Sequence, residues 1–100
     1  MQDSDFPMIR RTPEGAECDV VVGLAHGIHS RPSARIAQAA RSFDAKVIIK
    51  AENGEVDASS MLDILSLAIP TNSSVTLLAS GPQAPEALKE IAGIIAEPGV

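Results

Sequence analysis

The sequence predicts an α+β domain, an open-faced β-sandwich in which three helices cover one face of a four-stranded antiparallel sheet. Three observations support this. Stretches of alternating or β-branched residues, typical of strands, are interleaved with stretches of helical period. Their order is βαββαβα, the split βαβ arrangement followed by one more helix. The chain has 100 residues, of which 45% are hydrophobic and 2% aromatic, enough for one domain with an aliphatic core.

Four segments have the pattern of strands: 17–22, 46–50, 55–57 and 74–79. The first alternates, so that Cys18, Val20 and Val22 face one side as in a half-buried strand. The dipeptide Asn53-Gly54 predicts the hairpin turn between the second and third strands. Asn72 lies in the turn before the fourth strand, where asparagine tolerates the left-handed conformation.

Three segments are predicted to be helical: 31–42, 60–68 and 84–96. The last has a clean amphipathic face. The middle one is apolar on two sides, with one stripe formed by Ile64, Leu67 and Ala68 and the other by Met61, Leu62 and Leu65. Either this helix is sunk in the core, which the residues alone slightly favour, or it keeps an apolar patch for a partner.

We expect a flexible N-terminal arm at 1–15, because it has no periodicity, then one domain at 16–96 and a C-terminal tail at 97–100. No apolar run is long enough to span a membrane, and the start of the chain does not resemble a secretory signal. Cys18 is alone, which favours a reducing cytoplasm and a role as a small buried hydrophobe.

The net charge of −5 is uneven along the chain. Residues 29–50 carry five basic side chains and one acidic side chain, a local balance of +4. A basic region on an acidic protein points to an acidic partner surface. Nucleic acid is not expected, because the aromatic platforms on which bases stack are missing.

The stretch from Gly27 to Arg35 reads GIHSRPSAR and places His29 at the mouth of the first predicted helix. Pro32 suits the first turn. The unpaired N–H groups of that turn attract anions, phosphate above all, and Arg31 would add charge-assisted hydrogen bonds. An imidazole beside such a site has what a transient phosphohistidine needs. His26 and His29 are three apart, but no Cys or carboxylate accompanies them, so we expect no metal site.

This stretch resembles the active-site loop of HPr, the histidine phosphocarrier family of the phosphoenolpyruvate-dependent sugar phosphotransferase system. The order of elements from about Cys18 to Ile95 agrees with that family. The resemblance implies a carrier without a cofactor, monomeric and cytoplasmic, that accepts phosphate on His29 from enzyme I and passes it to a sugar-specific acceptor domain. Ser30 and Arg31 would bind the phosphate. Such a carrier is not a free-standing enzyme.

The resemblance also implies roles for the second helix. Met61, Leu62 and Leu65 would dock partner enzymes, and Ser60 matches a regulatory serine, although a helix-capping hydroxyl explains it without modification. The chain departs from the family at His26, where asparagine is frequent, and at Asp63. Two alternatives stay open: a regulatory carrier like that of the nitrogen-related branch, and a non-catalytic binding module with the HPr fold.

Overall fold

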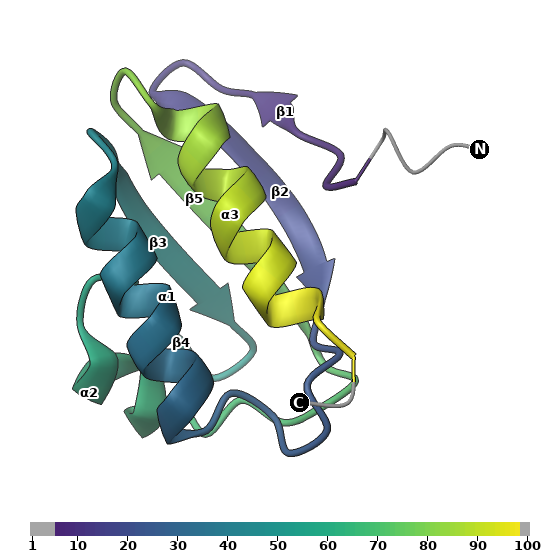
Figure 1. Cartoon of the computed structure of the whole chain (residues 1–100). Helices are drawn as coiled ribbons and strands as arrows, with labels where there is room; N and C mark the ends of the chain where they lie inside the picture. The colour runs from purple at the N-terminus through teal and green to yellow at the C-terminus, as the bar shows by residue number, and fades with distance from the viewer. Residues whose placement is uncertain (1–5, 99–100) are drawn as a thin grey trace.

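The computed structural model describes residues 6–98 and shows an antiparallel sheet with helices packed on one face (Figure 1). The strands are β1 (Arg10–Arg11), β2 (Gly15–Val21), β3 (Lys46–Ala51), β4 (Gly54–Asp57) and β5 (Ser74–Ser80). The helices are α1 (Ser30–Ser42), α2 (Met61–Ser66) and α3 (Ala84–Ala96). The spatial order in the sheet is β1-β2-β5-β3-β4. The α+β open-faced sandwich predicted from the sequence is confirmed.

The sheet has one more strand in the described residues than the sequence predicted. β1 pairs with β2 through Arg10 opposite Glu17 and Arg11 opposite Ala16. The flexible arm expected at 1–15 is therefore wrong from Pro7 onward, because Pro7 is buried and Ile9 packs against the core before β1 begins. Residues 1–5 lie outside the described part. A strand of two residues is too short to show an alternating pattern in the sequence. It is ordered by its pairing with β2. Of the C-terminal tail predicted at 97–100, the structure describes residues 97 and 98.

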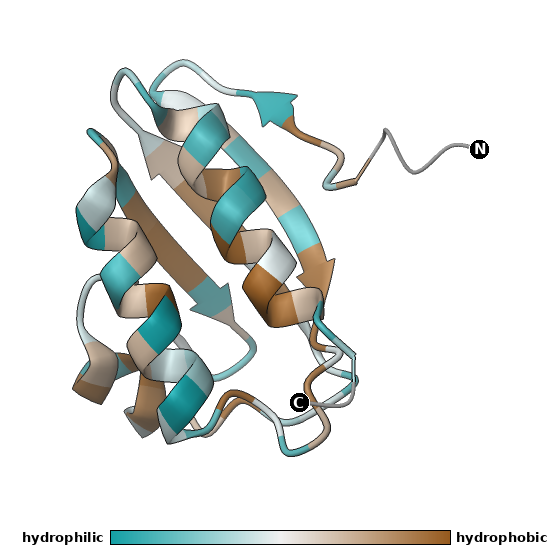
Figure 2. Ribbon diagram, in the orientation of Figure 1, coloured by the Kyte–Doolittle hydropathy of each residue, from teal (hydrophilic) through white to brown (hydrophobic). Residues whose placement is uncertain are grey.

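The core lies between the sheet and the helices and is aliphatic, as the composition predicted. Its largest fully buried side chains include Leu24, Ile36, Ile49, Ile64, Leu77, Leu88, Ile91 and Ile95. Figure 2 shows hydrophobic and hydrophilic residues alternating around α3, as expected for a helix with one buried face. Cys18 is fully buried, and this burial raises the pKa of its thiol to about 11. Its role as a small core residue is confirmed.

The second helix is shorter than predicted. It ends at Ser66, and Ala68 adopts the left-handed conformation with φ of 48°, which stops the helix. Ala68 was expected in the buried stripe with Ile64 and Leu67, but its side chain is exposed because the backbone has already turned. Asn72 has φ of 69°, so the left-handed turn predicted there is confirmed.

The longest helices among residues 6–98 have 13 residues each. None of the described helices combines the length and apolar character needed to span a bilayer.

Candidate functional site

The loop of residues 22–29 links β2 to α1 and is held in place by backbone segments from elsewhere in the chain. The Val22 N–H donates to the Ser73 carbonyl at 2.8 Å, and the Gly23 N–H donates to the Ile95 carbonyl at 3.0 Å. The Ile28 N–H donates to the Ile69 carbonyl at 2.9 Å. Leu24 and Ile28 are both buried. The loop is therefore a fixed support for the residue that follows it.

Gly27 is required by the geometry directly before the histidine. Its φ of 73° lies in the left-handed region, and a Cβ atom at this position would lie 2.4 Å from the Ile69 carbonyl oxygen. Any side chain here would push the loop away from the segment that follows α2. Gly27 thus lets the backbone turn closely enough for Ile28 to reach the core.

His29 is the N-cap residue of α1, with φ of −88° and ψ of −164°. Its carbonyl accepts the first hydrogen bond of the helix, from the Ser33 N–H at 3.0 Å, but its side chain makes no capping hydrogen bond. The imidazole is therefore not used to hold the helix. Its Nε2 atom is buried. Among residues 6–98, it is the one buried side-chain nitrogen or oxygen atom that has no hydrogen-bond partner.

The first turn of α1 leaves donors free beside His29. The N–H groups of Ser30 and Arg31 have no backbone acceptor within the described chain, and Pro32 has no N–H. No acidic residue lies in this turn, and the side chains of Ser30 and Arg31 are exposed. The helix dipole adds to the attraction of these donors for an anion. The turn is chemically suited to bind phosphate oxygens.

The other arginines of α1 have partners away from this turn. Arg35 Nη1 lies 2.7 Å from the Glu97 carboxylate, which joins α1 to the end of α3. Arg41 Nη1 donates to the Ser59 carbonyl at 2.9 Å, which joins α1 to the start of α2. In the part of the chain that the structure describes, Arg31 makes no such contact, so its guanidinium is available to the site.

His26 lies in the same loop and its side chain is exposed. The rings of His26 and His29 approach edge to face, with centroids 6.0 Å apart. Within residues 6–98 no group of three or more His, Cys, Asp or Glu side chains comes together as metal ligands.

The side chains of α2 divide between the core and the surface. Leu62 is 76% exposed, whereas Met61 and Leu65 are half-buried and Ile64 is fully buried. The alternative in which this whole helix is sunk in the core is therefore wrong for Leu62, and the helix keeps an apolar side chain in solvent. The segment after α2 reaches the histidine loop through Ile69, so the C-terminal end of α2 and the loop are linked by backbone hydrogen bonding.

Ser60 caps α2, as its hydroxyl accepts a hydrogen bond from the Asp63 N–H at 3.3 Å. The capping role expected for this serine is confirmed. The side chain of Asp63 itself is exposed.

The support that α3 gives to the loop has almost no sequence signal. A Cβ on Gly23 would lie 2.3 Å from the Ala96 carbonyl oxygen, so a glycine two residues after the end of β2 is the one local hint of this close approach. The pairing of Arg35 with Glu97 joins residues 62 positions apart and has no local pattern.

The chain matches a family model described as the PTS HPr component phosphorylation site, over residues 16–97. The HPr-like protein Crh of Bacillus subtilis is 36% identical over 78 residues, which are 78% of this chain and 92% of Crh. The phosphocarrier protein HPr of Bacillus anthracis has a similar structure, with a TM-score of 0.75 at 37% identity, covering 79% of this chain and 94% of that one. A crystal structure of Crh, described as an intertwined dimer with domain swapping, aligns with a TM-score of 0.66 at 34% identity, covering 81% and 93%.

The fold and the loop geometry define an open-faced sandwich that presents one histidine at a helix N-terminus. The chain belongs to the HPr family, the histidine phosphocarriers of the phosphotransferase system.

Proposed function

We propose that His29 accepts a phosphoryl group from enzyme I through its Nδ1 atom and passes it to a sugar-specific acceptor domain. The observation that carries this proposal is the orientation of the ring. Nε2 is enclosed by the protein, so a reaction partner in solution reaches the ring through Nδ1. In the accepting step the Nδ1 lone pair forms a bond to phosphorus as the bond from phosphorus to the donor breaks. In the donating step a nucleophile of the acceptor domain bonds to phosphorus as the Nδ1–P bond breaks, which regenerates the free imidazole.

The anionic oxygens would be held by the free N–H groups of Ser30 and Arg31 and by the Arg31 guanidinium. Preformed donors stabilise the transferring group without rearrangement of the loop. These donors are exposed to solvent, which weakens each contact and keeps the affinity for phosphate modest. A modest affinity suits a carrier that must accept and release the same group.

The partner surface would combine the histidine loop with the exposed side of α2. Leu62 provides the apolar contact, and Met61 and Leu65 flank it as half-buried neighbours. The basic side chains of α1 would steer an acidic partner toward this surface. We propose a monomer acting in the cytoplasm as the simplest form of such a carrier.

A regulatory carrier is the second candidate, supported by the 36% identity to the HPr-like protein Crh, which the description of its crystal structure connects with catabolite repression. Ser60 would take part in this role. Its hydroxyl caps α2, and a phosphate added there would lie at a helix N-terminus, where negative charge is favoured.

The test is incubation with purified enzyme I and phosphoenolpyruvate, followed by mapping of the phosphate. Transfer to an acid-labile, base-stable adduct supports the carrier function. Absence of transfer would identify a binding module that kept the fold and lost the chemistry. Offering the phosphorylated protein to sugar-specific and to regulatory acceptor domains then separates the two candidate functions.

A further inference from the structure

His26 is held in a tight turn just before the candidate phosphoryl site. The Gly27 N–H donates to the Leu24 carbonyl at 3.1 Å, which closes a turn with Ala25 and His26 at its centre. Leu24 and Gly27 are buried, whereas the side chain of His26 is exposed. The backbone therefore fixes the place of this imidazole ring, and solvent reaches it.

The rings of His26 and His29 meet edge to face, with centroids 6.0 Å apart. Because Nε2 of His29 is buried, a phosphoryl group would be attached to Nδ1, on the side of the ring that is open to solvent, as His26 is. A charge on the His26 ring would then lie no further from the phosphoryl group than about one Debye length, roughly 8–10 Å at ordinary ionic strength. The two charges would therefore interact.

The segments that bind the histidine loop bring no unpaired carboxylate to it within the described chain. Residues 69–73 form hydrogen bonds near both ends of the loop and contain no ionisable side chain. The first turn of α1 has no acidic residue and carries the exposed Arg31. At the end of α3, Glu97 is paired with Arg35 at 2.7 Å. The charge of Arg31 disfavours a second positive charge nearby in the unphosphorylated protein.

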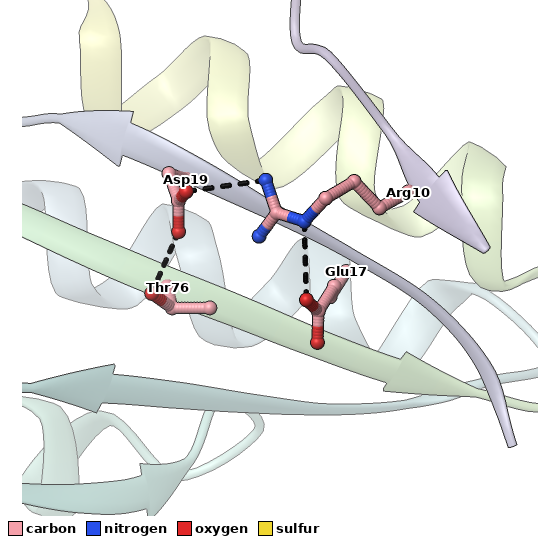
Figure 3. A network of polar contacts seen from close by, with 4 residues as sticks. All are labelled: Arg10, Glu17, Asp19 and Thr76. Atoms are coloured by element: carbon pink, nitrogen blue, oxygen red, sulfur yellow. Dashed lines mark hydrogen bonds and ion pairs between the residues drawn. The ribbon is translucent and has the colours of Figure 1, made fainter. Parts of the chain in front are cut away.

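The carboxylates of β2, the strand that leads into the loop, are also occupied. Arg10 lies 3.1 Å from a carboxylate oxygen of Glu17 and of Asp19 (Figure 3). The second oxygen of Asp19 accepts a hydrogen bond from the Thr76 hydroxyl at 2.8 Å. Glu52 is exposed in the β3–β4 hairpin, and among residues 6–98 no backbone hydrogen bond joins that hairpin to the loop. A phosphoryl group at the head of α1 would therefore be the principal negative charge beside the turn.

We propose that the His26 imidazole takes up a proton when His29 is phosphorylated, and that its positive charge then stabilises the phosphoryl group. This inference rests on the proposed transfer to His29. Phosphorus exchanges its bond to the donor for a bond to Nδ1, as before, and the proton on His26 comes from solvent.

Proton uptake is expected from the chemistry of the two groups. Imidazole ordinarily titrates near about pH 6.5, and a phosphoryl group carries a charge of about −1.5 to −2, so its arrival favours the charged ring in the neutral range. Binding equilibria are reciprocal: a proton on His26 must raise the affinity of the site for the phosphoryl group by the same factor. The protein would then hold its phosphoryl group more tightly at slightly acid pH.

The experiment compares the full-length wild type with His26→Gln, which stays neutral, and His26→Lys, which stays charged. Each protein is equilibrated with a catalytic amount of enzyme I at a fixed ratio of phosphoenolpyruvate to pyruvate, from about pH 6 to about pH 8. Phosphorus NMR reports the ratio of phosphorylated to free protein. An equilibrium does not depend on how well enzyme I docks, and effects of pH on the donor cancel when variants are compared at one pH.

We expect the wild type to approach His26→Lys at the acid end and His26→Gln at the alkaline end. Its ratio relative to His26→Gln should change by about 3- to 10-fold across this range, the size expected for a dianion and a cation at this separation in water. A purely structural role of His26 would instead give a constant offset from His26→Gln at every pH, and that result would overturn the proposal. So would a His26→Lys protein that is less phosphorylated than His26→Gln. Labelling of the wild type without the pH effect refutes this inference alone, whereas absence of labelling refutes the proposed function as well.

Discussion

The imidazole rings of His26 and His29 lie edge to face, with centroids 6.0 Å apart and planes inclined by 70°. Only His29 caps α1 beside the free N–H groups. We therefore expect His29→Ala to abolish labelling by enzyme I and His26→Ala to retain it, because the ring of His26 lacks the neighbouring N–H donors that we propose for the phosphate. Mass spectrometry after acid and base treatment measures this. Phosphate found on His26 in the wild type would contradict the assignment.

Arg31 and Arg41 carry the same charge in different surroundings. Arg31→Lys keeps the charge but loses the planar guanidinium. The transfer rate should fall by about 10- to 100-fold, which corresponds to the loss of one hydrogen bond to a charged group. The loss should persist at high salt, because a short-range contact is poorly screened. Stopped-flow transfer from enzyme I across a salt series measures both properties.

Arg41→Lys is the matched control, since Arg41 contacts the Ser59 carbonyl at the far end of α1. It should transfer at nearly the wild-type rate. If Arg31→Lys behaves in the same way, Arg31 serves only to steer partners and does not bind phosphate.

Leu62 and Ile64 lie two residues apart on α2, one 76% exposed and the other fully buried. Leu62→Glu should change the free energy of unfolding by less than about 0.5 kcal/mol, as expected for a surface site, while weakening partner binding. Ile64→Ala should cost about 2–5 kcal/mol, because it leaves a cavity. Urea titration and calorimetric binding to enzyme I separate the two effects. Unfolding of the Leu62→Glu protein would place that residue in the core.

The Asp57 carboxylate makes the stability of the domain depend on acid pH. Hydrogen bonds from the Ser59 N–H at 2.9 Å, and then from the Ser59 hydroxyl at 2.7 Å, lower the pKa of Asp57. Since the folded pKa lies below the unfolded value of about 3.9, the stabilisation is complete above that pH and is lost as the pH falls through the folded pKa.

Asp57→Asn should therefore lower the melting temperature near neutral pH by about 4–8 °C, equivalent to about 1 kcal/mol after allowance for solvent screening. The difference from the wild type should shrink below about pH 4. Thermal melts from neutral to acid pH measure it. A constant difference at all pH values would mean that the charge of Asp57 is not what stabilises this turn.

The fold was predictable from the sequence because its elements carry local patterns. The alternation around Cys18 and Val20 and the Asn53-Gly54 turn need no distant partner to be recognised. The motif from Gly27 to Pro32 likewise indicated the position of His29 at a helix start. Features that depend on contacts with distant residues were not predictable. β1 forms because it pairs with the edge of β2, and the side chain of Ala68 is exposed because Ala68 itself adopts the left-handed conformation.

The geometry of the candidate site was predictable only in part. The free donors of the first helical turn follow from Pro32 and the N-cap position. The hydrogen bond from Gly23 to Ile95 depends on how α3 ends against the loop, and the enclosure of Nε2 in His29 depends on the folded surroundings of the ring; no periodicity in the sequence reports either.

The dependence of the loop on late parts of the chain has a consequence during protein synthesis. β2 pairs with β5 from Gly15 opposite Ser80 onward, and Gly23 receives its hydrogen-bond partner from Ile95. His29 therefore leaves the ribosome well before the backbone that fixes it, because contacts of such sequence separation form only once both partners are present. A nascent or prematurely terminated chain would expose the histidine without its support. Under the proposed function, the ability to receive phosphate would arise only when α3 has docked, so unfinished molecules would not divert phosphoryl groups from finished ones.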